Sequence, residues 1–135
     1  MVMGLDNGIY VRSNKRRLTK DMLPATLSYP FPEITEDLEI AYFRKYWGMR
    51  NEIVGSFQHH DEYNTILFET PEQVRKLISI IASWLNEAKW NEEGDSIWEY
   101  ESAARNLINV IVNLSTIYAF MQNNPDVYLE FYDSY

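Results

Sequence analysis

Residues 37–54, DLEIAYFRKYWGMRNEIV, form the stretch around which the rest of the chain is organised. Apolar side chains recur in it at steps of three and four residues, which is the spacing of one face of an α-helix. One apolar row comprises Leu38, Ala41, Tyr42, Tyr46, Met49 and Ile53, and a second row beside it comprises Ile40, Phe43, Trp47 and Val54. The pattern predicts a single helix from Asp37 to Val54.

A helix that is apolar over most of its circumference must be covered on several sides. We therefore expect Trp47 to be buried between this helix and two others, so that its truncation to Ala costs about 3–5 kcal/mol. The remaining polar stripe carries Arg44 and Lys45, with Arg50 close by. This stripe is open to two interpretations: a solvated surface with local ion pairs, or a basic spot that holds an anion or an acidic partner segment.

The other elements follow from shorter signals. Thr70-Pro71-Glu72-Gln73 combines a capping hydroxyl, a proline at the first helical position and a glutamine three residues after the cap, which is typical of a helix start. The expected elements are a strand at 4–11, a strand at 63–69, helices at 71–89 and from 95 or 96 to 122, and a strand from 127. In the final helix, the predicted apolar seam includes Ile108.

These elements predict one α+β domain over residues 1–135, with three helices packed on a small antiparallel sheet of about three short strands. The last strand is expected to pair with the first strand or with 63–69. The edge strand of so small a sheet exposes unpaired backbone N–H and C=O groups, and a homo-oligomer could form by pairing of such edges.

Composition and charge exclude several classes of function. The 135 residues carry a net charge of −8 and no cysteine, which excludes disulfides and thiolate chemistry. Five of the basic residues nevertheless fall within residues 12–20, around Lys15, Arg16 and Arg17. Because the rest of the chain is acidic, we expect no direct binding to nucleic acid. With no membrane span and no signal peptide in the sequence, a cytoplasmic protein is the expectation.

No phosphate-binding glycine loop and no nucleophile elbow is present. His59, His60 and Asp61 are the densest set of metal-ligating residue types, but neighbouring side chains point in different directions, so a polar loop is favoured and no metal or cofactor is expected. Trp90 and Trp98 are candidate binding residues, because Trp is enriched in binding hot spots. Filling the margin of the core is the alternative role for these rings.

Two islands, Met3-Gly4-Leu5-Asp6 and Glu39 to Lys45, resemble a family of small uncharacterised bacteriophage and prophage proteins. Its members open with Met-Gly-Leu-Asp and carry a Tyr-Trp-Arg-Lys helix. The resemblance covers the first third of the chain, with Phe43 in place of the Trp and Met49-Arg50 where the family has Ile-His. It implies a phage-associated setting in a bacterial cell and no particular activity.

Two functions remain open at this stage. The first is a non-enzymatic, phage-associated interaction protein with a protein partner, in a sharper form an acidic inhibitor of a host nucleic-acid enzyme that offers carboxylates where phosphates would lie. The second is a small enzyme or ligand-binding domain that holds an anionic substrate with Arg44, Lys45 and Arg50 and uses His59 or His60 to carry protons.

Overall fold

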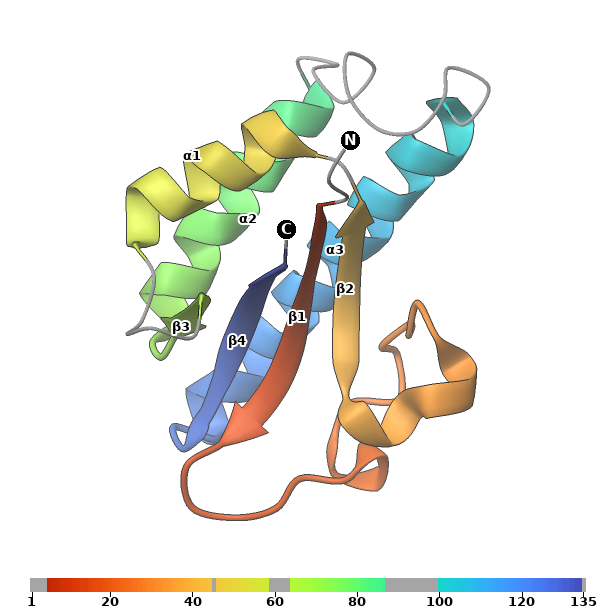
Figure 1. Ribbon diagram of the computed structural model, residues 1–135. Coiled ribbons are helices and arrows are strands. Elements are labelled where there is room, and N and C mark those ends of the chain that lie inside the picture. The colour runs from red at the N-terminus through yellow and green to blue at the C-terminus, as the bar shows by residue number, and fades with distance from the viewer. Residues whose placement is uncertain (1–4, 45, 59–63, 87–99, 135) are drawn as a thin grey trace.

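The computed structural model describes residues 5–44, 46–58, 64–86 and 100–134 (Figure 1). The elements in chain order are β1 (Asp6–Ser13), the 3-10 helices η1 (Lys20–Met22) and η2 (Pro32–Asp37), β2 (Glu39–Arg44), α1 (Trp47–Phe57), β3 (Thr65–Phe68), α2 (Pro71–Asn86), α3 (Tyr100–Asn123) and β4 (Val127–Ser134). The predicted α+β class is confirmed, with four antiparallel strands where about three were expected.

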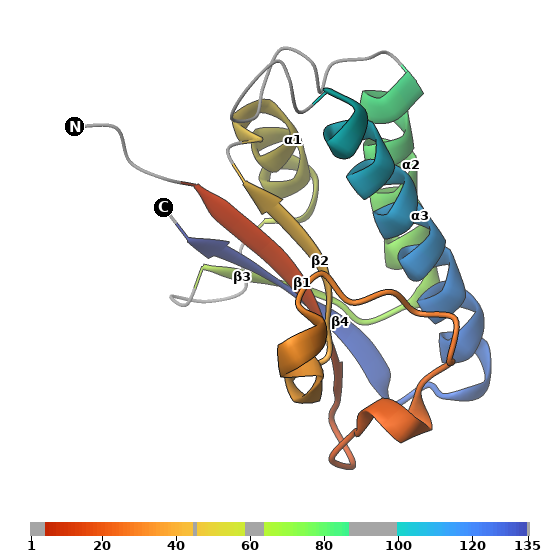
Figure 2. The same cartoon turned by 90° about the vertical axis from the view of Figure 1, so that its right-hand side faces the viewer.

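The strand order is β2-β1-β4-β3, so the first and last strands of the chain form the centre of the sheet. β1 and β4 pair over their full lengths, from Asp6 opposite Ser134 to Ser13 opposite Val127. β4 also pairs with β3, so it joins both of its predicted partners. The three α-helices lie on one side of this sheet (Figure 2).

The single helix predicted over residues 37–54 is wrong. Leu38 adopts a left-handed conformation with φ of 58°, which ends η2, and the chain then enters β2. β2 pairs with β1, with an irregularity between Ile9 and Tyr10, and a helix begins only at Trp47. The three- and four-residue spacing was misleading because pairing with a strand far away in the sequence, which local periodicity does not report, determines the conformation of β2.

The expected burial of Trp47 is also wrong, because its side chain is 39% exposed. Trp47 occupies the first turn of α1 instead of the middle of a longer helix. α1 buries Met49 and Ile53, while the neighbouring β2 buries Phe43.

The predicted start of α2 is confirmed in detail. The backbone N–H of Gln73 donates to the hydroxyl of Thr70 at 3.3 Å, and the side-chain oxygen of Gln73 accepts from the N–H of Thr70 at 3.0 Å. This reciprocal pair is a capping box. The end of the final helix at Asn123 also agrees with the sequence, but Ile108 lies 48% exposed instead of in the buried seam.

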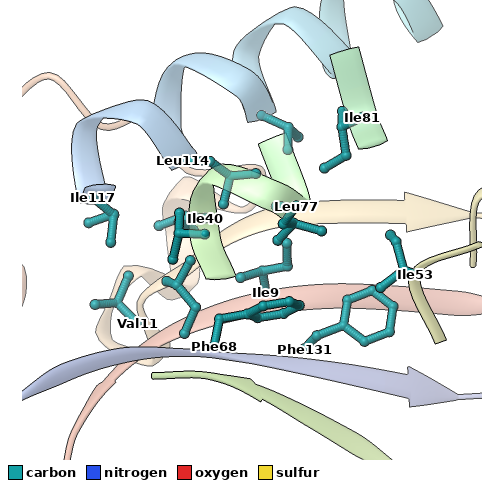
Figure 3. Packing of buried hydrophobic residues seen from close by; sticks show 14 of the residues in the cluster. Ile9, Val11, Ile40, Ile53, Phe68, Leu77, Ile81, Leu114, Ile117 and Phe131 are labelled. Atoms are coloured by element: carbon teal, nitrogen blue, oxygen red, sulfur yellow. The ribbon is translucent and has the colours of Figure 1, made fainter. Parts of the chain in front are cut away.

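The core fills the space between the sheet and the helices (Figure 3). Ile9 of β1, Phe68 of β3 and Phe131 of β4 are fully buried on the side of the sheet that faces the helices. Ile53 of α1 and Leu77 of α2 pack against them from above.

α3 also covers the outer edge of β2. The side-chain amide of Asn113 donates to the backbone carbonyl of Ile40 at 2.9 Å, and that of Asn106 donates to the carbonyl of Tyr42 at 3.1 Å. Side-chain amides of α3 therefore occupy backbone acceptors of this edge strand.

Candidate functional site

The face of the sheet that points away from the helices carries tyrosines and charged side chains. Along β4, every second residue from Val127 to Asp133 is buried, and the residues between them are half-buried. The strand register places the same alternation on the other strands. We call this surface the outer face; its residues are Asp6, Gly8, Tyr10, Arg12, Glu39, Tyr42, Arg44, Thr65, Leu67, Tyr128, Glu130 and Tyr132.

At its centre, two tyrosines surround one glutamate. The hydroxyl of Tyr132 donates to Oε1 of Glu39 at 3.5 Å, and Tyr10 lies close enough to influence the same carboxylate. The centroids of the two rings are 5.4 Å apart. A β-carbon at Gly8 would lie 2.2 Å from Cε1 of Tyr132 and 2.7 Å from Oε1 of Glu39, so the cluster sits directly on this glycine.

Burial governs the ionisation of this cluster. Desolvation raises the pKa of Glu39, and the hydrogen bonds from Tyr10 and Tyr132 offset that rise only in part. Desolvation, with the nearby charge of Glu39, also raises the pKa of Tyr132. Within the described ranges Glu39 forms no ion pair, and the more distant charge of Arg12 offsets the desolvation of its carboxylate only in part.

A second tyrosine–carboxylate pair lies beside this cluster. The hydroxyl of Tyr42 donates to Oδ1 of Asp6 at 2.5 Å. Desolvation, together with this hydrogen bond, raises the pKa of Tyr42 to about 12. The ring of Phe31 packs edge-on against Tyr42, with centroids 5.1 Å apart, and supports it from the segment before η2.

Arg12 is held in place on the same face. Its guanidinium carbon lies 4.4 Å from the ring centroid of Tyr10, and its Nε is 3.8 Å from a carboxylate oxygen of Glu130. Its Nη1 donates to the backbone carbonyl of Asp37 at 2.9 Å. The face already binds one guanidinium over a tyrosine ring, which shows the kind of contact its chemistry supports.

Arg50, a predicted binding residue, lies on the opposite side of the sheet. Its Nε and Nη2 bond the carboxylate of Asp133, the shortest contact being 2.6 Å. The side-chain amide of Asn7 donates to the same carboxylate at 2.9 Å. This bidentate pair joins α1 to β4, which gives Arg50 a structural partner.

Arg44 and Arg50 are therefore not brought together. Arg44 is exposed on the outer face, opposite Asp6 in the register, whereas Arg50 points to the helix side. Lys45, His59, His60, Asp61, Trp90 and Trp98 lie outside the described residues. In the part of the chain that is described, no group of three metal-ligating side chains occurs.

Part of the positive charge of residues 12–20, called here the basic loop, is neutralised by an acidic residue of the same chain. Nε of Arg16 lies 2.8 Å from Oδ2 of Asp126, and the hydroxyl of Ser13 donates to the same oxygen at 2.7 Å. The Ser13 hydrogen bond, followed by that from Arg16, lowers the pKa of Asp126. Lys15 and Arg17 are exposed in the same loop.

Glu39, Tyr10 and Tyr132 are site residues that the sequence did not predict. The alternation of Tyr128, Glu130 and Tyr132 in the last strand was a visible signal of one tyrosine-rich face. Glu39 gave no such signal, because the predicted helix placed it among unrelated neighbours.

A small cavity of about 70 Å³ lies between α3, β2 and the segment Ser28–Pro30, and Asn106, Asn109 and Asn113 line it. Its lining includes none of the residues predicted to hold an anionic substrate. Among the described helices, none is long and apolar enough to span a membrane. No protein-family model, curated protein or solved structure matches the chain.

Proposed function

We propose that this is a non-enzymatic interaction protein that binds a basic segment of a partner protein through the outer face of its sheet. The observation that carries the proposal is the Glu39 carboxylate, half-buried among tyrosines and without an ion pair in the described structure. A desolvated carboxylate that lacks a cation is costly. A lysine or arginine from a partner would compensate it.

The surroundings of Glu39 suit such a cation. Tyr10 already makes a cation–π contact with Arg12, and Tyr is enriched among the residues that dominate binding energy. Asp6 and Glu130 add carboxylates on the same face. Most residues of the face are half-buried, and the described pocket lies elsewhere, which suits a protein segment better than a small molecule enclosed in a pocket.

The resemblance to phage-associated proteins supports a narrower setting for this proposal. The partner would be a protein of the bacterial host cell, met in the cytoplasm, and a nucleic-acid enzyme has the basic surface that these carboxylates require. In that version, Asp6, Glu39 and Glu130 lie where phosphates of the nucleic acid would otherwise bind. No cofactor takes part.

Affinity capture from bacterial lysate tests the proposal with matched charge-reversal variants. Glu39→Lys/Glu130→Lys reverses two charges of the outer face, and Asp21→Lys/Glu69→Lys reverses two exposed charges elsewhere. We expect the unaltered protein and the second variant to retain the same basic protein, and the outer-face variant to lose it. Equal retention by both variants contradicts the proposed surface.

A further inference from the structure

The solvent-facing side of α3 carries no charge over most of its length. No Asp, Glu, Lys or Arg occurs from position 106 to 123, although 24% of the chain is charged. Ile108 and Val112 lie on this side and are 48% and 51% exposed. Ser115 and Ala119 follow on the same side and are also exposed. A surface helix normally places charged or polar residues there.

The order of large and small residues along this side is self-complementary. When two α3 helices are placed antiparallel with a twofold axis between positions 113 and 114, Ile108 faces Ala119 of the other copy and Val112 faces Ser115. Large side chains then meet small ones at both ends of the contact. A twofold interface requires this reciprocity, in which residue i contacts j and j contacts i.

Charge also favours α3 over other surfaces for a contact between copies. Each chain carries a net charge of −8, so two copies repel each other over most of their surface. The uncharged side of α3 is a region where they can approach without bringing like charges together. In contrast, Asn113 and Asn106 already occupy carbonyls on the edge of β2.

We infer that the protein forms a reversible homodimer through an antiparallel pair of α3 helices, with Val112 near the centre. One helix from each copy gives a contact at the small end of the range for stable interfaces, so the dimer depends on concentration. The outer face lies on the other side of the sheet and stays uncovered. A dimer would therefore present two outer faces.

Sedimentation equilibrium over a wide range of protein concentration tests the dimer. We expect self-association of the unaltered chain, a monomer for Val112→Glu, and unchanged association for Ile34→Glu. Ile34 is the matched control because it is 46% exposed and lies in η2, away from α3. A monomeric unaltered chain, or a Val112→Glu variant that still dimerises, overturns the inference.

Disulfide trapping tests the antiparallel register, because the chain contains no cysteine of its own. Val112→Cys mixed with Ser115→Cys should give mainly the mixed 112–115 disulfide after mild oxidation. A parallel pair would instead favour the 112–112 disulfide of the Val112→Cys variant alone, and that result overturns the proposed arrangement. Circular dichroism of each variant checks that α3 remains folded.

Discussion

Asp133 and Glu39 are carboxylates on opposite faces of one sheet, and their surroundings differ in kind. The side chain of Asp133 is fully buried and is bonded by the guanidinium of Arg50 and the amide of Asn7. Glu39 is half-buried, and tyrosine hydroxyls are its partners. Asp133 thus has a full countercharge within the chain, whereas Glu39 has none at ion-pair distance in the described structure.

This difference separates a structural group from a candidate binding group better than burial alone. Removing the guanidinium or the amide that bonds Asp133 would leave its buried negative charge without a partner. Around Glu39, neutral hydroxyls are the hydrogen-bonding neighbours, and the more distant Arg12 compensates the charge of the carboxylate only in part. A surface with a carboxylate like Glu39 gains the most binding free energy when a partner supplies a cation next to it.

The largest effect is expected on the helix side. Arg50→Ala leaves the buried Asp133 without its cation and should lower the free energy of unfolding by about 3–5 kcal/mol. Urea denaturation measures it. The double variant Arg50→Met/Asp133→Leu should lose much less, because it leaves no stranded charge. A loss below about 1 kcal/mol for Arg50→Ala is what an exposed surface ion pair would give, and it would contradict the structural role assigned to this pair.

A smaller effect is expected at the outer face. Gly8→Ala places a β-carbon against the ring of Tyr132 and should cost about 1–3 kcal/mol, as overpacking does. The ring must move away from Glu39, so the variant should also bind a basic partner less well. Gly55→Ala is the control, because its β-carbon would meet nothing within 4 Å. Equal stability of the two variants would mean that the Tyr132 ring does not rest on Gly8.

The contrast also explains which parts of the molecule could be predicted. The start of α2 depends on Thr70, Pro71 and Gln73, which are neighbours in the sequence, so local rules were sufficient. β2 depends on pairing with β1, and Arg50 reaches Asp133 across 83 positions of the chain. The approach of Tyr132 to Gly8 is likewise non-local. Helical spacing in a short apolar stretch could not report any of these contacts.

The pH dependence of stability should be smaller still and has a definite sign. Because the folded-state pKa of Glu39 is raised, the folded protein binds a proton at this site more tightly than the unfolded chain does. Its contribution to stability is therefore lost as the pH rises above the ordinary range for glutamate. Relative to Glu39→Gln, the unaltered protein should become less stable between about pH 4 and about pH 7.

Urea denaturation of both proteins across that range gives the difference. A difference that does not change with pH would mean that Glu39 is as well solvated in the folded protein as in the unfolded chain.

We expect no measurable binding of the protein to nucleic acid. The exposed basic residues Lys15 and Arg17 are attached to an acidic body, and Asp126 neutralises Arg16. Duplex binding normally requires several phosphates to be neutralised at once. Fluorescence anisotropy with random single- and double-stranded DNA at about 0.15 M salt should show no binding. Affinity in the micromolar range or better would make the basic loop, instead of the outer face, the principal binding surface.

The most direct test of the outer face is a nuclear magnetic resonance titration of the isotope-labelled protein with a lysine-rich peptide at physiological salt. We predict that the amide signals of Tyr10, Glu39 and Tyr132 shift together, and that Glu39→Gln weakens this response without unfolding the protein. Shifts confined to α3 or to the surroundings of the exposed Glu72 of α2, or an unchanged response in Glu39→Gln, would contradict the assignment of the outer face as the binding surface.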